Sequence, residues 1–175
     1  MSTNTPPRTT DPIEAARALA PQLKAASADI ERDQRIPQPL FEAMADAGLF
    51  KLLVPRSLGG REVDLSTFAQ AVEEVAKGDA SAAWCVSQAN GTAMRSAYVS
   101  PEFGQALVGP RLSALASGTG PIHTNRAVVA PGGYRVTGEW GFASGGHHST
   151  WMCAESRLYN EDGTPMLTDA GKPVT

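Results

Sequence analysis

Phe142 and Ser144 place an aromatic ring and a hydroxyl two residues apart, between Gly141 and the pair Gly145-Gly146. Residues 134–144 alternate apolar and polar side chains, which predicts a strand that ends with this ring and this hydroxyl at a rim. Glycines on both sides remove side-chain bulk, so a ligand can approach the backbone closely. The combination predicts a surface against which a flat ring can lie.

Segment 133–146, Gly-Tyr-Arg-Val-Thr-Gly-Glu-Trp-Gly-Phe-Ala-Ser-Gly-Gly, resembles the flavin-facing strand of the acyl-CoA dehydrogenase superfamily. The usual wording there is a glycine, two or three residues, and then Trp-Ile-Thr-Asn-Gly. Phe142 stands at the tryptophan position and Ser144 at the threonine position. With His147, His148 and Trp151 following, the segment is closer to the branch of flavin-dependent monooxygenases, which hydroxylate phenols or oxygenate dibenzothiophene.

A second segment carries the same resemblance. Residues 39–50, Pro-Leu-Phe-Glu-Ala-Met-Ala-Asp-Ala-Gly-Leu-Phe, followed by Val54-Pro55 and Leu58-Gly59-Gly60, are similar to the amino-terminal helical signature of the superfamily. The resemblance extends over roughly residues 12–158. It implies a flavin cofactor, FAD or FMN, because stacking and one hydroxyl would contact only the ring that both cofactors share.

The resemblance also implies roles for single residues. Ser144 would hydrogen-bond the flavin near its central ring nitrogen, and Phe142 would stack beside the ring. The alternatives are a strand-end serine that meets solvent and an ordinary core aromatic. Segment 117–119 (Ser117, Gly118 and Thr119) stands where the family offers backbone groups to the pyrimidine side of the flavin, although it departs from the dehydrogenase wording Thr-Glu-Pro.

Trp84 is at the position where the family's amino-terminal domain borders the substrate cavity, and core packing is its alternative role. No carboxylate can be assigned as a catalytic acid or base, so the sequence yields no catalytic residue. The adjacent pair His147-His148 suggests a metal site or a general base. However, neighbouring residues on a strand point to opposite faces, and no cysteine or carboxylate pattern completes a set of metal ligands. We therefore expect a solvated histidine pair and no metal site.

Composition excludes several classes of function. Hydrophobic residues make up 42% of the 175 residues, charged residues 19%, and the formal net charge is -3, which favours neither nucleic acid nor an anionic membrane surface as a partner. We find no apolar run near the roughly 20 residues of a membrane helix and no signal peptide, so we expect a cytoplasmic protein. Cys85 and Cys153 have no disulfide or zinc spacing.

The elements that position these residues change type along the chain. Capping signals and 3.6-residue periodicity predict helices from Pro12, Pro39, Asp64 or Ser66, Asp79 and Ser100 onward. Asp11 is the expected cap of the first helix, and Gly48 is the expected stop of the second. After Pro110 the pattern predicts strands over 112–117, 127–130, 134–144 and 151–158, with a turn at 161–163. We therefore expect an α+β chain with three regions, which are a disordered 1–11, a helical domain over 12–110 and part of a β domain over 111–175.

The resemblance adds that the last region is an incomplete antiparallel β-barrel domain, and that the family's C-terminal four-helix domain is absent, so the sequence suggests a fragment. Three hypotheses for function follow. The first is a monooxygenase that uses reduced flavin and oxygen on an aromatic or heteroatom substrate, with a flavin reductase as a possible partner and a homo-oligomeric state at full length. The second is an acyl-CoA dehydrogenase with FAD. The third is an inactive fragment or interaction module.

Overall fold

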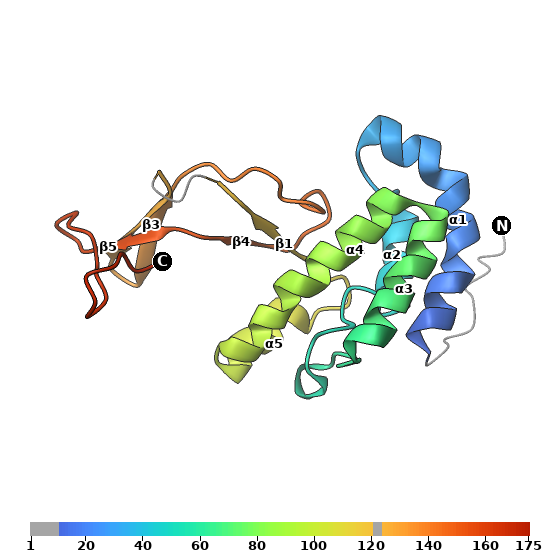
Figure 1. Ribbon diagram of the computed structural model, residues 1–175, viewed down its shortest axis with the longest axis horizontal. Coiled ribbons are helices and arrows are strands. Elements are labelled where there is room, and N and C mark those ends of the chain that lie inside the picture. Colours follow the sequence, from blue (N-terminus) through green and yellow to red (C-terminus); the bar gives the residue numbers. More distant parts are fainter. Residues whose placement is uncertain (1–10, 121–123) are drawn as a thin grey trace. The chain divides into compact units, whose positions relative to one another are not determined.

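We describe residues 11–120 and 124–175 from a computed structural model of the chain. Helices occupy the first part of the described chain and short strands the second (Figure 1). This order confirms the predicted α+β class. The expected disordered segment, 1–11, lies outside the described residues except for Asp11.

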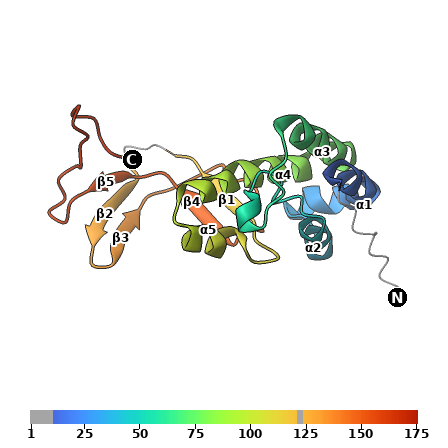
Figure 2. The same ribbon diagram turned by 90° about the horizontal axis from the view of Figure 1, so that it is seen from below.

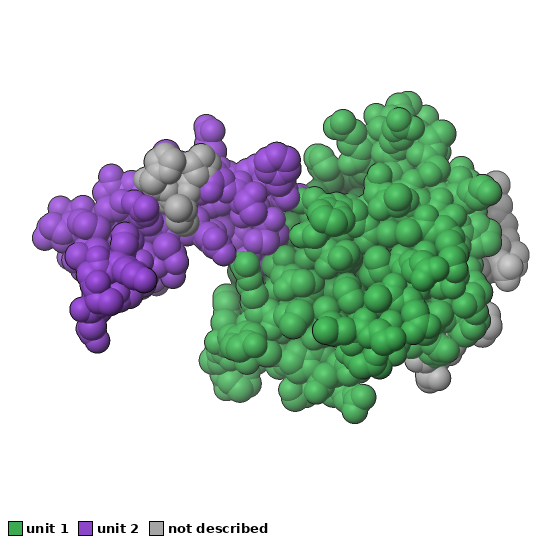
Figure 3. All heavy atoms as spheres, viewed as in Figure 1, with its two compact units in different colours: residues 1–116, 144–152 green, residues 117–143, 153–175 purple. Residues whose placement is uncertain are grey.

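The chain divides into two compact units (Figure 3). The first, which we call the helical unit, contains the chain up to Ala116 together with Ser144–Met152. The second, the strand unit, contains Ser117–Ala143 and Cys153–Thr175. The loop at residues 144–150 falls within the range 111–175 that we expected to form the β domain, yet it clusters with the helices.

Aspartate side chains start three of the helices, as the sequence predicts. Each carboxylate accepts a hydrogen bond from a backbone N–H in the first turn, at 2.8–2.9 Å, which satisfies a donor that has no partner inside the helix. These caps are Asp11 before α1 (Pro12–Asp33), Asp64 before α3 (Leu65–Gly78) and Asp79 before α4 (Ala80–Ala93).

Proline and serine mark the other helices. The remaining elements of this unit are α2 (Gln38–Asp46), the short 3-10 helices η1 (Arg56–Leu58) and η2 (Met94–Tyr98), and α5 (Pro101–Val108). Gly48, the predicted stop of α2, has φ +76°, a left-handed conformation that only glycine adopts at low cost. The Ser100 hydroxyl caps α5 through the N–H of Phe103.

The core of the helical unit lies between α1, α2, α3, α4 and the segment that follows α2 (Figures 1 and 2). Its most deeply buried side chains are apolar and come from all of these elements, namely Leu19, Leu23, Met44, Leu49, Leu52, Val75 and Val86. Burial of such side chains is the main stabilising contribution to a domain of this size.

Two polar or small residues complete this packing. Asn90, fully buried on α4, donates from Nδ2 to the carbonyl oxygens of Leu49 (2.7 Å) and Val86 (2.9 Å). Its Oδ1 accepts from the N–H of Leu53 at 3.1 Å. Asn90 therefore fastens the segment after α2 to α4.

A Cβ at Gly60 would lie 2.0 Å from the carbonyl oxygen of Val54, so this position has room only for glycine.

The strands form two small sheets. One pairs β1 (Leu115–Gly118) with β4 (Trp151–Ala154), and the other has the order β3 (Gly133–Thr137), β2 (Arg126–Ala130), β5 (Arg157–Tyr159). β2 and β3 are antiparallel and joined by a turn at Gly132, whereas β2 and β5 are parallel. The described strands do not close a barrel, and the parallel pair differs from the all-antiparallel arrangement that we expected.

The predicted strand over 134–144 is too long, because β3 ends at Thr137. Gly141 then exchanges two backbone hydrogen bonds with Thr119, and Phe142 has φ +53°, which no strand residue adopts. The predicted turn at 161–163 is confirmed. Asp162 accepts from the N–H of Thr164, and Gly163 has φ +82°.

Candidate functional site

The candidate site is the loop of residues 144–150, which packs on the helical unit. Ser144, at its start, accepts a hydrogen bond of 2.9 Å from the indole Nε1 of Trp84 on α4. Since the indole can only donate, it fixes the serine oxygen as an acceptor and leaves the serine O–H proton to donate elsewhere. Ser144 thus has a hydroxyl whose orientation is fixed by a protein contact. The alternative, a strand-end serine that contacts only solvent, would have no such contact.

Trp84 is not a core residue, because 58% of its surface is exposed although it lies in the middle of α4. The other face of α4 buries small side chains such as Ala82, Ala83 and Val86. An exposed indole that is held by one polar contact offers a flat apolar face to a ligand. The sequence pattern places Trp84 on a helix, now seen as α4. It did not show whether the side chain faces the core or the outside.

Gly145 brings the loop against α4 next to Trp84. It has φ +78°, and a Cβ at this position would lie 3.7 Å from the Cβ of Cys85. Burial, with a smaller contribution from the Asp79 carboxylate, raises the pKa of the Cys85 thiol. The thiol is therefore protonated at neutral pH and serves as a packing group for the loop rather than as a nucleophile.

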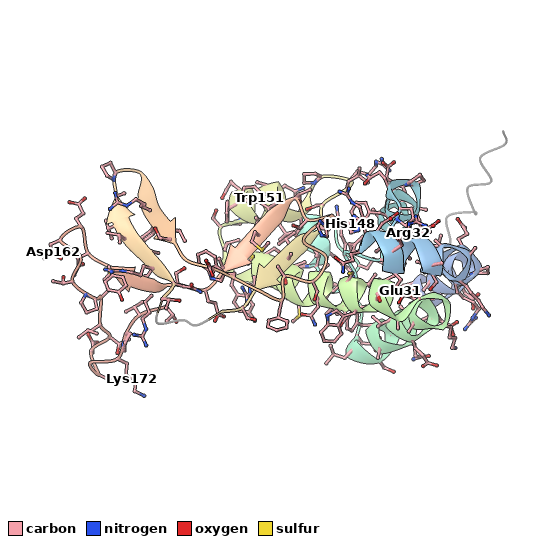
Figure 4. The ribbon with its side chains drawn as sticks, turned by 90° about the horizontal axis from the view of Figure 1, so that it is seen from above. Glu31, Arg32, His148, Trp151, Asp162 and Lys172 are labelled. Atoms are coloured by element: carbon pink, nitrogen blue, oxygen red, sulfur yellow. The ribbon has the colours of Figure 1, made fainter. Side chains whose placement is uncertain are left out.

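The far end of the loop is fastened to the corner between α1 and α2 (Figure 4). The carbonyl oxygen of His147 accepts from the guanidinium of Arg35 at 3.0 Å, and His148 Nε2 accepts from the N–H of Ile36 at 3.0 Å. The His148 ring stacks on Phe41 with a centroid distance of 4.8 Å. Our expectation of a solvated pair holds for His147, which is exposed, and is wrong for His148, which is packed.

Phe142 precedes this loop and belongs to the strand unit. Its side chain is 91% exposed, so the alternative role of a core aromatic is wrong. The positive φ of Phe142 is unusual for an aromatic residue and costs about 1 kcal/mol or more. Its predicted role in stacking on a flavin remains a prediction.

The three residues of segment 117–119 differ in what they can offer. Ser117 and Gly118 lie in β1, and a Cβ at Gly118 would approach the Cβ of Trp140 to 2.6 Å, so this glycine makes room for a tryptophan of the same unit. The N–H and carbonyl of Thr119 are both paired with Gly141, at 2.8 and 2.7 Å. The backbone N–H of Thr119 is therefore already engaged and is not offered to a ligand.

Within residues 11–120 and 124–175, no group of three histidine, cysteine, aspartate or glutamate side chains is arranged to hold a metal ion. The same residues include no helix long and apolar enough to cross a membrane.

Residues 13–114 match the amino-terminal domain of the acyl-CoA dehydrogenases. The chain belongs to the acyl-CoA dehydrogenase family. The matched range covers α1 to α5, and so includes Trp84, Asn90 and the Leu58-Gly59-Gly60 turn that carried the resemblance.

Within this family, the similar proteins have oxygenase names. The chain is 29% identical over 158 residues to the oxygenase subunit HsaA of a flavin-dependent monooxygenase from Rhodococcus jostii, and covers 38% of it. It is 30% identical over 139 residues to the oxygenase component of an FADH2-dependent resorcinol hydroxylase from a Rhizobium species, and covers 33% of that protein. These segments represent 90% and 78% of the present chain.

Solved structures give the same result. XiaF from a Streptomyces species, determined in complex with FADH2 and glycerol, superposes with a TM-score of 0.81 at 27% identity, over 89% of this chain and 39% of XiaF. The predicted resemblance to the monooxygenase branch of the family is thus confirmed. The chain spans between a third and two fifths of the length of these relatives.

Proposed function

We propose that this family member acts in the oxygenase component of a flavin-dependent monooxygenase that hydroxylates an aromatic substrate. The observation that carries the proposal is the hydrogen bond from Trp84 to Ser144, which holds a hydroxyl at the position that the family resemblance assigns to the flavin contact. The similarity to HsaA and to the resorcinol hydroxylase supports the reaction class and the aromatic substrate.

The residues around the loop are suited to hold a flavin. The Ser144 hydroxyl, oriented by Trp84, can hydrogen-bond the flavin near its central ring nitrogen, and the exposed face of Trp84 can lie against an aromatic substrate or the ring itself. Reduced flavin, when bound, would supply the electrons that activate oxygen. Ser144 would orient the ring, and Trp84 would hold Ser144 and help exclude water from the face on which the reaction proceeds.

Phe142 and segment 117–119 are secondary contacts in this proposal. The family resemblance assigns stacking on the flavin ring to Phe142 and the pyrimidine side of the flavin to backbone groups of segment 117–119. The choice between FAD and FMN stays open, because the groups named here all address the shared ring. FADH2 is bound in the XiaF structure, and the resorcinol hydroxylase is named as FADH2-dependent, which favours FAD.

A separate flavin reductase and a homo-oligomeric state belong to the same proposal. The resorcinol hydroxylase relative is named as an oxygenase component, which supports a partner that delivers reduced flavin. Several large apolar side chains of the helical unit are exposed in the isolated chain, including Tyr98 (86%), Phe103 (47%) and Met94 (42%). Exposed apolar side chains of this kind are typical of subunit contacts. A location in the cytoplasm stays a prediction from the sequence.

The deciding experiment titrates the purified chain with oxidised and dithionite-reduced FAD and FMN. Flavin fluorescence and size-exclusion chromatography are recorded on the same samples. We expect binding that favours reduced flavin and weakens about two- to tenfold in Ser144→Ala, as loss of one hydrogen bond implies. Ser149→Ala is the matched control, because Ser149 lies in the same loop and, among the described residues, its hydroxyl donates to the carbonyl of Gly146 within that loop.

Two results would contradict the proposal. The first is a folded, monodisperse chain that binds neither flavin in either redox state. The second is tight binding of oxidised FAD that is bleached by an acyl-CoA, since this would indicate the dehydrogenase alternative.

A further inference from the structure

His148 lies in the same loop as Ser144 but contacts a different part of the helical unit. Its ring stacks on Phe41 of α2 at an interplanar angle of 15°, and Phe41 is itself only 3% exposed. Phe41 packs in turn on Phe50, with ring centroids 5.0 Å apart. His148 is therefore the point at which the loop reaches the core.

The polar contact of His148 fixes its protonation state. Ile36 is 2% exposed, and its N–H needs a partner because an unpaired buried N–H is costly. His148 Nε2 supplies that partner at 3.0 Å, which requires a lone pair on this nitrogen. The imidazole is then neutral and carries its proton on Nδ1. Nδ1 is buried and has no hydrogen-bond partner among the described residues.

The loop connects this contact to Ser144 through a compact turn. The N–H of His148 donates to the carbonyl of Gly145 at 2.9 Å, and the Ser149 hydroxyl donates to the carbonyl of Gly146 at 3.0 Å. Gly145 rests against Cys85, and Ser144 accepts from Trp84. A movement of His148 therefore also moves Ser144, because a single hydrogen-bonded turn connects the two residues.

The charges that face His148 oppose a second proton. Arg35, from the corner between α1 and α2, and His147, from the loop, act on the ring as positive neighbours. Phe41 of α2 presents an uncharged ring. Burial, followed by these two charges, lowers the pKa of His148 from its ordinary value of 6.5. A proton on Nε2 would also point directly at the N–H of Ile36.

We propose that His148 is a positioning residue whose neutral imidazole holds the 144–150 loop in the geometry that brings Ser144 to Trp84, and whose protonation releases that contact. The consequence for a bound flavin rests on the function proposed above. The effect on the Trp84–Ser144 contact does not depend on flavin and can be measured in the chain alone.

The test follows the indole N–H of Trp84 by ¹H–¹⁵N NMR on the labelled chain between pH 8 and pH 5, with the signal assigned from Trp84→Phe. We expect the signal to shift in one step with a midpoint below 6.5. In His148→Gln, where the amide oxygen accepts from Ile36 but does not titrate, the step should vanish. In His148→Phe, which has no acceptor, the signal should occupy its low-pH position even at pH 8.

His147→Gln is the matched control, because His147 is exposed and uses only its backbone oxygen. It should keep the step, with the midpoint moved toward 6.5 because one positive neighbour of His148 is removed. A step that persists in His148→Gln, or that is lost in His147→Gln, would overturn the proposal. Far-UV circular dichroism checks folding, and if His148→Phe does not fold, the unmodified chain and His148→Gln still decide.

Flavin titration separates this proposal from the previous one. At pH 8 we expect His148→Phe to bind reduced flavin about two- to tenfold more weakly than His148→Gln, which is the range for one lost hydrogen bond. If the indole signal behaves as described but no variant binds flavin, the proposed function fails and the positioning role stands. If the chain binds flavin but substitution of His148 leaves the indole signal unchanged, the proposed function stands and the positioning role fails.

Discussion

The indole Nε1 of Trp84 donates a hydrogen bond of 2.9 Å to the hydroxyl oxygen of Ser144, 60 residues further along the chain. The tryptophan comes from the helical segment of the family match and the serine from the loop beyond it. This contact therefore couples the range that matches the family's amino-terminal domain to segment 133–146, which resembles the superfamily's flavin-facing strand. It also gives an otherwise exposed tryptophan a fixed orientation.

Replacing Trp84 by phenylalanine should weaken binding of reduced flavin about two- to tenfold and change the free energy of unfolding by no more than about 1 kcal/mol. The ring is retained, but the donor to Ser144 is lost. A double-mutant cycle with Ser144→Ala measures the coupling, because the second substitution should have little further effect once the first has removed the contact. Fully additive losses would show that the two residues act separately.

The sequence predicts best what is decided locally. The caps at Asp11, Asp64 and Asp79 and the stop at Gly48 depend on residues within one turn of the helix, so composition and spacing are sufficient to find them. The family resemblance is also local, since it depends on short motifs of consecutive residues. It placed Ser144 and Trp84 in the candidate site without indicating that they touch.

The sequence could not predict contacts between residues that lie far apart along the chain. The alternation over 134–144 continues past the end of β3, and nothing in that pattern signals the left-handed Phe142 or the pairing of Gly141 with Thr119. His148 was also misjudged as solvated, because only the fold brings Ile36 and Phe41 to this side chain. Asn90 was overlooked for the same reason, since its three partners lie on the segment after α2 and one turn back on α4.

Asn90→Leu should lower the free energy of unfolding by about 1–3 kcal/mol, and more if several groups lose their partners together. The substitution keeps the volume but leaves the carbonyl of Leu49 and the N–H of Leu53 unpaired. Urea unfolding followed by circular dichroism measures the change. Gln70→Leu, at an exposed position of α3, should alter stability by less than about 0.5 kcal/mol. Equal effects of the two substitutions would contradict the role assigned to Asn90.

Two glycine substitutions should change stability in opposite directions. At Gly60 a Cβ would lie 2.0 Å from the carbonyl oxygen of Val54, so Gly60→Ala must displace backbone and should destabilise the chain by about 1–3 kcal/mol. At Gly91, exposed within α4, nothing lies within 4 Å, and Gly91→Ala should stabilise the helix by about 0.5–1 kcal/mol. Thermal unfolding of both variants tests the pair, and a stable Gly60→Ala would mean that the turn after η1 can relax.

Acid should weaken the contact between α1 and α3 through Glu74. The Arg17 guanidinium, at 3.0 Å, and then the Lys77 ammonium, at 2.8 Å, lower the pKa of the Glu74 carboxyl to about 2. A carboxyl whose pKa is lower in the folded state contributes stability that is complete above its ordinary value of 4.5. That contribution is lost as the pH falls from 4.5 through about 2.

Glu74→Gln should therefore flatten the pH dependence of stability between pH 4.5 and pH 2, and leave the variant less stable than the unmodified chain at pH 7. Denaturant midpoints measured at several pH values reveal the slope. Glu73→Gln is the matched control, because this neighbouring carboxylate is 67% exposed and lies 3.4 Å from the same lysine, where a solvated ion pair contributes little. If Glu73→Gln flattens the profile as much as Glu74→Gln does, the acid sensitivity belongs to the helix surface in general and not to the link between α1 and α3.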